Sequence, residues 1–91
     1  MSWIMNKFEW DENKRTLNFE KHGIDFVDAI DVFMDLSRIE FESIRDGELR
    51  YQTIGSVNDV VLLVVYTYRS STVRLISARR ANKNEREAYY S

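Results

Sequence analysis

The sequence predicts an α+β fold in which a small antiparallel sheet is covered by two helices that precede most of its strands. Residues 60–68 are β-branched or aromatic and nearly free of polar side chains. Such a run is typical of a strand covered on both faces, so we place it at the centre of the sheet. Helical periodicity also gives way to alternating periodicity after Ser37. We therefore expect a four-stranded meander, together with a short N-terminal strand at residues 8–10.

Two helices are predicted ahead of the meander. Asp11 is suited to cap the first helix, which ends at His22 because Gly23 can adopt the left-handed conformation that closes a helix. Asp25 is suited to cap the second helix. The apolar residues of this helix recur at helical spacing and are Phe26, Ala29, Ile30 and Phe33. We expect both helices to cover one face of the sheet, with the second lying across it.

Turn signals separate the four later strands. Alternating segments at 39–44 and 49–54 flank Gly47, which can take the positive φ of a hairpin turn. Polar segments at 56–59 and 68–71 enclose the central strand and are typical of turns.

A short C-terminal helix is predicted from Glu85 to Tyr90, because Asn82 and Glu85 have the spacing of a capping box. This helix would display Tyr89 and Tyr90, and further large apolar side chains precede the first strand. They are Trp3, Ile4 and Met5. So much aromatic and apolar surface is more than a small core hides, and we expect a tight protein partner over part of the helices and the C-terminal end.

The segment 72–81 is the main candidate for a functional site in the chain. An arginine on a rigid strand can hold an anion in a fixed place, because its planar guanidinium offers several donors and stays protonated. Strict alternation puts Arg74 and Arg79 on opposite faces. One face would carry Thr72, Arg74, Ile76 and Ala78, and the other Val73, Leu75, Ser77 and Arg79. A bend or bulge near Ala78 is therefore needed if both guanidinium groups are to bind one anion.

Length and composition limit the classes of protein. The 91 residues fit one domain, residues 1–91. Without cysteine there is no disulfide or thiolate metal site, and the single histidine, His22, argues against a histidine zinc site. We expect no metal and no cofactor. The apolar run at 60–68 is too short to span a bilayer and the first residues do not form a signal peptide, so we expect a soluble, cytoplasmic protein.

The distribution of charge is more informative than its balance. Thirteen Lys and Arg against 15 Asp and Glu do not indicate a nucleic-acid binder. Acidic residues crowd between Asp25 and Glu48, however, and cations gather in the last quarter of the chain. These cations are Arg69, Arg74, Arg79, Arg80, Lys83 and Arg86. They form either a basic patch on a mildly acidic protein or part of an ordinary mixed surface.

The usual catalytic motifs are absent from the sequence, which has no phosphate-cradling glycine loop, zinc-ligand spacing or Ser-His-Asp set. It does hold cations able to bind a phosphate and groups able to move a proton, which are the ingredients of a ribonuclease that needs no metal. They are Lys21, His22, Glu48, Arg50, Arg74 and Arg79.

Each candidate also has an ordinary structural explanation. Lys21 and His22 suit the C-terminal end of a helix, where the helix dipole favours cations. Arg74 and Arg79 can form ion pairs with the many carboxylates, and Ser77 can be a small strand residue that bonds to the backbone. The residues alone leave both interpretations open.

Four segments carry a resemblance to a known family. They are Phe-Glu-Trp-Asp at 8–11, Lys-His-Gly-Ile at 21–24, Arg-Leu-Ile-Ser-Ala-Arg at 74–79 and Glu-Arg-Glu-Ala-Tyr-Tyr at 85–90. In this order and spacing, the segments resemble the BrnT family of toxins of type II toxin–antitoxin systems. The resemblance extends over residues 8–90.

The resemblance implies a RelE/ParE-like fold and a metal-independent endoribonuclease that cleaves RNA and inhibits translation. It also implies neutralisation by a BrnA-type antitoxin, a heterotetramer formed through that antitoxin, and contact with operator DNA only through the complex. The positions carried over as catalytic candidates are Lys21, His22, Glu48, Arg50, Arg74, Ser77 and Arg79, without assignment of acid or base. Arg69, Arg80 and Lys83 are the candidate RNA-binding residues.

A second hypothesis comes from another class of protein. A chain with the toxin fold and no nuclease activity would act as a co-repressor or structural subunit with its antitoxin. Induced expression distinguishes the two, because only the enzyme arrests growth with cleavage of RNA.

Overall fold

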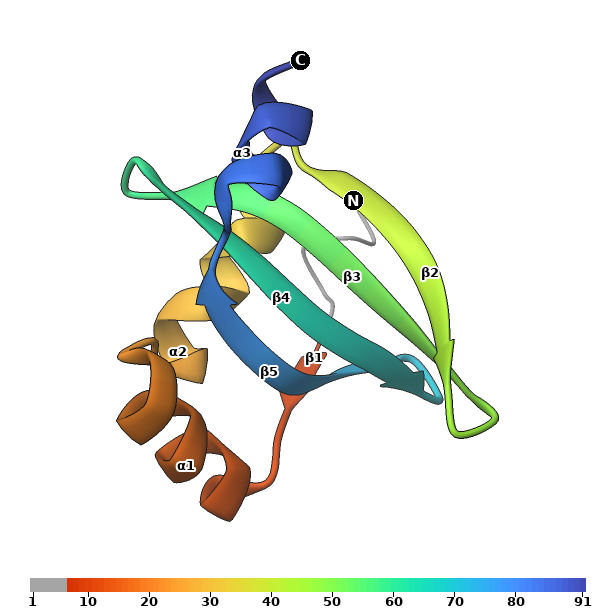
Figure 1. The fold of residues 1–91 in the computed structure, drawn as a ribbon. Coiled ribbons are helices and arrows are strands. Elements are labelled where there is room, and N and C mark those ends of the chain that lie inside the picture. Colours follow the sequence, from red (N-terminus) through yellow and green to blue (C-terminus); the bar gives the residue numbers. More distant parts are fainter. Residues whose placement is uncertain (1–6) are drawn as a thin grey trace.

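The computed structural model describes residues 7–91 and has the predicted α+β class (Figure 1). Its elements are β1 (Lys7–Glu9), α1 (Glu12–His22), α2 (Phe26–Ala29), the 3-10 helix η2 (Ile30–Met34), β2 (Ile39–Arg45), β3 (Glu48–Val57), β4 (Val60–Arg69), β5 (Thr72–Arg80) and α3 (Lys83–Tyr90). No helix in residues 7–91 is long and apolar enough to cross a membrane. Trp3, Ile4 and Met5, which contributed to the predicted partner surface, lie outside the described residues.

The five strands form one sheet in the order β1-β5-β4-β3-β2. The meander from β2 to β5 is antiparallel and β4 lies in the middle, as the apolar run at its position predicted. The prediction of a wholly antiparallel sheet is wrong, because β1 pairs in parallel with β5. Three helical segments and three strands separate β1 from β5 in the chain, so no tight turn forces these two strands to run in opposite directions.

The hairpin turns follow the predicted chemistry. Asp46 and Gly47 both have positive φ angles, of 53° and 79°, which is the geometry that matches the twist of a two-residue hairpin. Asn58 and Asp59 form the next turn with φ angles of 50° and 68°. Small polar residues at these positions tolerate the left-handed conformation, and so each strand reverses within two residues.

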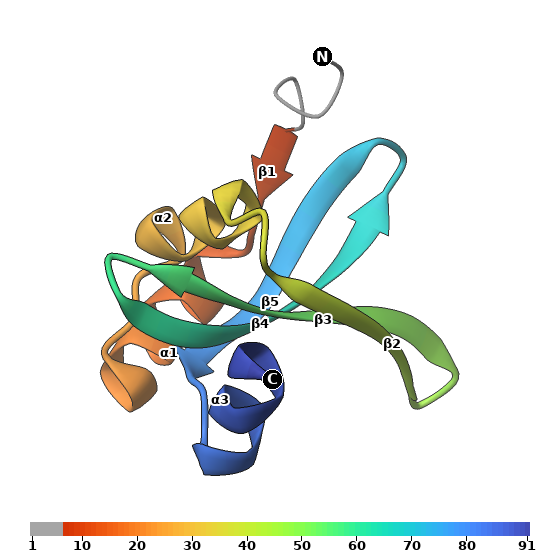
Figure 2. The same ribbon diagram turned by 90° about the horizontal axis from the view of Figure 1, so that it is seen from above.

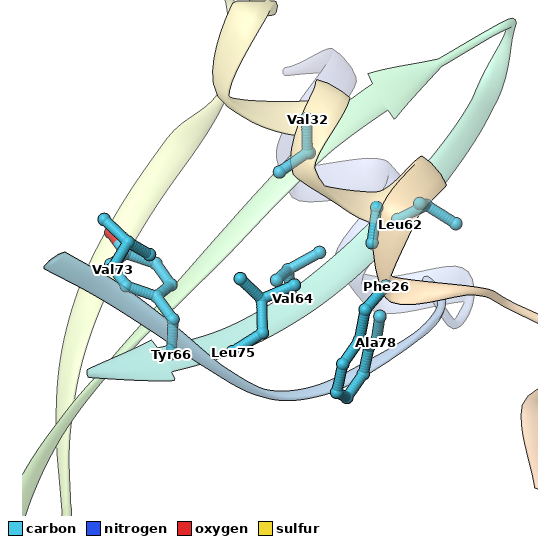
Figure 3. Packing of buried hydrophobic residues seen from close by; sticks show 9 residues of the cluster. Phe26, Val32, Leu62, Val64, Tyr66, Val73, Leu75 and Ala78 are labelled. Atoms are coloured by element: carbon cyan, nitrogen blue, oxygen red, sulfur yellow. The ribbon is translucent and has the colours of Figure 1, made fainter. Parts of the chain in front are cut away.

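The main core lies between the helices and one face of the sheet, which we call the helix face. Phe26 and Val32 are buried against β4 and β5 (Figure 3), and Ala29 belongs to the same buried cluster. The strand residues of this cluster are Leu62, Val64, Tyr66, Val73, Leu75 and Ala78. The alternating apolar residues of β4 and β5 thus meet the second helical segment, as predicted. The predicted stripe is confirmed only in part, because Val32 is fully buried whereas Ile30 and Phe33 are partly buried.

The second helix differs from the prediction of one continuous α-helix, because α2 ends at Ala29 and continues as the 3-10 helix η2. The narrower η2 packs directly on the backbone of β3 at Gly55. A Cβ at Gly55 would stand 2.7 Å from Cγ2 of Val32 and 3.1 Å from Cβ of Arg38. Only glycine permits this approach, which brings η2 onto the sheet.

A buried amide in α1 replaces the missing part of β1. Because β1 pairs only with Thr72 to Arg74, the outer edge of β5 is free of strand partners beyond them. The side chain of Asn18 donates to the carbonyl of Ala78 at 2.8 Å and accepts from the N–H of Ala78 at 3.0 Å. The same amide donates to the carbonyl of Ile24 at 3.0 Å, so it joins α1, the loop after it and β5.

The C-terminal helix α3 packs on the other side of the sheet from α2 (Figure 2). Its predicted capping box is present, with Asn82 and Glu85 exchanging hydrogen bonds, and the helix begins at Lys83, two residues earlier than predicted. Tyr89 packs beside Ile54 and its hydroxyl donates to the carboxylate of Asp35. Tyr90 is exposed.

The substitution Asn18→Ala should destabilise the protein by at least about 2 kcal/mol, because it leaves buried backbone groups of β5 without partners. Asn13→Ala, an exposed change in the same helix, is the matched control and should cost well under that amount. Denaturant unfolding measures both. Equal stability of the two variants would show that the amide is not needed to close the edge of β5.

Candidate active site

The register of β5 against β4 shifts in the middle of the strand. Ser77 lies opposite Val65 and Leu75 lies opposite Tyr66, so Ile76 has no partner across the ladder. An extra residue of this kind is a β-bulge, and it reverses the side on which the following side chains project.

The bulge puts both strand arginines on the face that points away from α1 and α2, which we call the open face. Arg74 lies opposite Thr67 and Arg79 opposite Leu63, and directly opposite residues share a face. The strict alternation expected from the sequence is therefore wrong beyond the bulge. The bend needed to bring the arginines together exists, two residues before the expected position at Ala78.

A hollow of about 450 Å³, which we call the polar groove, lies on the open face and is lined by four strands. Its polar lining residues are Ser43 and Arg45 from β2, Arg50 and Gln52 from β3, and Ser77 from β5. Val65 and Ile76 supply apolar lining. Two guanidinium groups, two hydroxyls and an amide offer many donors in one place, an arrangement suited to a phosphate group.

Glu48 does not line the groove, but it pairs with Arg50, which does. Arg50 donates from Nε to Oε1 of Glu48 at 2.9 Å, and the Glu48 side chain is more than half exposed. Arg45 lies opposite Glu48 in the ladder and has no salt bridge within residues 7–91. The groove therefore holds Arg50, whose charge is partly neutralised, and Arg45, which has no salt bridge in this part of the chain. The solvent-accessible carboxylate of Glu48 lies beside the groove, bound to Arg50.

Arg74 and Arg79 share the open face with the groove but do not line it, and each holds a carboxylate from another element. Arg74 donates to Glu9 of β1 at 2.7 Å. Arg79 makes two parallel hydrogen bonds of 2.8 Å to Glu85 of α3. These contacts fit the structural explanation of both arginines, and their part in catalysis stays a prediction.

The Arg79–Glu85 pair alters the ionisation of both partners. The hydrogen bond from Arg79 lowers the pKa of the Glu85 carboxyl, although burial alone would raise that pKa. The same bond raises the pKa of Arg79. Since Glu85 also accepts from the N–H of Asn82, its charge helps to hold α3 on the sheet.

Lys21 and His22 do not join the other candidates. Both lie in the last turn of α1, just before the left-handed Gly23. Helix α1 packs along the outer edge of β5 through Asn18 (Figure 1), and neither Lys21 nor His22 lines the polar groove. Their position agrees with the structural explanation that cations are favoured at a helix C-terminus.

The three predicted RNA-binding residues are scattered. Arg69 lies at the end of β4, with Nη1 3.7 Å from Oε2 of Glu9. Arg80 lines a hollow on the helix side beside Gly23. Lys83 is exposed on α3. Together they form no single basic patch.

Sequence reasoning missed Ser43, Arg45 and Gln52. Arg45 falls between the predicted strand segments at 39–44 and 49–54, in the turn around Gly47, so alternation within these segments assigns its side chain to neither face. The two-residue turn fixes the register of the hairpin and could have identified these residues. Pairing outward from Asp46 and Gly47 places Ser43 opposite Arg50. Counting across the hairpin would have put these side chains on one face.

The fold and the groove together define the class of the protein, which is a small α+β protein with a cationic groove on one face of its sheet. Residues 10–85 match the family described as "Ribonuclease toxin, BrnT, of type II toxin-antitoxin system", and the chain belongs to this family. The resemblance read from the sequence is thus confirmed, and membership of a toxin–antitoxin family implies an antitoxin partner. A comparison with curated proteins finds no match.

Acid should weaken the attachment of α3 through Glu85. Because the folded pKa of Glu85 is lowered, its stabilising contribution is present above the unfolded value of about 4.3 and is lost as the pH falls through the folded value. Glu85→Gln should therefore lower the melting temperature at pH 7 and flatten its decline below about pH 4. Melting curves across this range measure both effects.

Glu20→Gln is the control, since Glu20 is an exposed residue of α1 without a salt bridge in residues 7–91. It should keep the acid profile of the unmodified chain. An unchanged acid profile in the Glu85 variant would contradict the assigned role of the pair.

Proposed function

We propose that the protein is an endoribonuclease toxin that cleaves RNA in the polar groove without a metal ion and thereby inhibits translation. Membership of the BrnT family supports the toxin role. One observation supports the proposed location of RNA cleavage. Arg45, Arg50 and Ser77 line one groove, although β2 and β5 are distant in sequence. Four further hollows in residues 7–91 each have at most one arginine in their lining.

In this proposal, the guanidinium groups of Arg45 and Arg50 hold the scissile phosphate and stabilise the charge that builds on its oxygens. Glu48 takes the proton of the RNA 2′-hydroxyl. The 2′ oxygen then attacks phosphorus and forms a 2′,3′-cyclic phosphate, while the bond to the 5′ oxygen breaks and that oxygen takes a proton from water. Ser77 donates a hydrogen bond to a phosphate oxygen.

The remaining candidate residues would contact the RNA away from the bond that is cleaved. We assign Arg74 and Arg79 to the phosphates next to the scissile phosphate. To bind them, each arginine must release the carboxylate with which it is paired in this structure. Arg69, Arg80 and Lys83 would bind the RNA farther from the cleaved bond, where sequence-independent contacts suffice. A catalytic role for Lys21 and His22 rests on the family resemblance alone, because they lie away from the groove.

The proposed partner is a BrnA-type antitoxin that forms a heterotetramer with the toxin in the cytoplasm and carries the contact with operator DNA. One observation favours the alternative of a non-catalytic subunit. Arg50, Arg74 and Arg79 each bind a carboxylate, which reduces the positive charge available to RNA. Growth arrest with RNA cleavage on induced expression, relieved by the antitoxin, distinguishes the enzyme from this alternative.

Arg45→Ala and Arg50→Ala should each reduce RNA cleavage by roughly a hundredfold, the loss typical of removing one preorganised contact to a transition state. The melting temperature should hardly change, because both side chains lie on the surface of the sheet. Cleavage of a labelled RNA in the presence of a chelator measures the activity and tests metal independence at the same time.

Lys14→Ala, which removes an exposed cation from α1, controls for a general loss of positive charge. It should keep full activity. Full activity in both arginine variants, or cleavage that stops when the chelator is added, would contradict the proposal.

A further inference from the structure

A second groove, of about 470 Å³, lies on the helix face beside η2. Its walls come from β1, η2, the turn after η2, and the paired ends of β4 and β5. Its apolar lining includes Phe8, Phe33, Met34, Leu36 and Tyr68. We call it the apolar groove, and none of its lining residues belongs to the polar groove.

The apolar side chains of this groove are open to solvent to an unusual degree. Leu36 is 93% exposed, Met34 61% and Tyr68 52%. The same face of the β2–β3 hairpin adds Ile44 and Leu49, which lie opposite each other and are also exposed. Large apolar side chains gathered on one face of a small protein are characteristic of a surface that another protein covers.

The charge around the groove is acidic. Asp31 lines it and Glu42 projects from the same face of β2, and neither has a salt bridge within residues 7–91. The lining cation, Arg38, is bound to Glu40 at 2.7 Å. An apolar surface with an acidic rim repels RNA and repels an identical surface of a second copy, but it attracts a basic segment.

We propose that the antitoxin anchors an amphipathic helix in the apolar groove. Its apolar side chains would cover Met34 and Leu36, and its Lys or Arg side chains would lie beside Asp31 and Glu42. This inference rests on the antitoxin partner of the proposed function, which the family membership implies, and not on the proposed cleavage of RNA. It adds that the antitoxin is anchored on the helix face, whereas RNA is cleaved on the open face, so that substitutions can separate neutralisation from cleavage.

Leu36→Glu tests the anchor directly. It puts a charge where the apolar face of the partner must pack, and it should weaken antitoxin binding roughly tenfold or more. Cleavage of RNA by the free toxin should stay unchanged, because Leu36 is remote from the polar groove. Leu17→Glu is the matched control: Leu17 is 63% exposed on α1, outside the groove, and the change should leave binding intact.

Asp31→Lys tests the charge without changing the apolar surface. It should weaken binding, and it should reduce the dependence of binding on salt because one attraction between opposite charges is lost. The probe is the purified antitoxin of the same toxin–antitoxin system. Binding is measured by calorimetry in an Arg50→Ala background that removes toxicity, and melting temperatures show that each variant is folded.

Unchanged affinity in both variants would overturn the inference. So would an equal loss in the Leu17 control, or a toxin dimer that Leu36→Glu dissociates, because a second copy would then be the occupant. A melting temperature lowered by Leu36→Glu with affinity intact would mean that the same chain covers the groove, and would also overturn it. If the free chain fails to cleave RNA while Leu36→Glu still loses the antitoxin, the proposed nuclease fails and the docking site stands.

Discussion

The bulge at Ile76 is the constraint on which the rest of the structure depends, because β5 must place apolar side chains on the helix face and polar side chains on the open face. Before the bulge Leu75 faces the helices, and after it Ala78 faces them as well, although three positions separate the two residues. Without the extra residue, the side chain of Arg79 would turn into the apolar core, where an unpaired charge is costly. With it, Arg79 and Ser77 reach the open face. The amide of Asn18 holds the backbone of Ala78 immediately beyond the bulge, so α1 supports the geometry that the open face requires.

The two faces of the sheet are linked at Asp35, at the end of η2. Its carboxylate accepts hydrogen bonds from the N–H groups of Ser37 and Ser56 and from the hydroxyl of Tyr89. Burial alone would raise the pKa of Asp35, but these bonds and the nearby charge of Arg38 together lower it. The same contact raises the pKa of Tyr89 to about 12, chiefly through the hydrogen bond. One carboxylate thus ties η2, β3 and α3 together, and so joins η2 of the apolar groove to β3 of the polar groove.

Much of the fold follows from local signals in the sequence. The apolar run of β4 predicted the central strand, Gly23 and Gly47 predicted a helix end and a turn, and Asn82 with Glu85 predicted the cap of α3. The parallel direction of β1 and the break after α2 depend on packing between distant segments, which local patterns do not encode. The site was harder to predict for the same reason: a bulge is set by register against β4, and one extra residue moved Ser77 and Arg79 to the other face.

The central claim is that RNA binds the open face rather than the C-terminal end of α1. The most direct test is an NMR titration with a short RNA that carries a 2′-deoxy substitution at the cleaved position, so that it binds without reacting. The account predicts shifts of the amide signals of Ser43, Gln52 and Ser77, with little change at Lys21 and His22. Shifts confined to Lys21 and His22, with an unchanged open face, would contradict it.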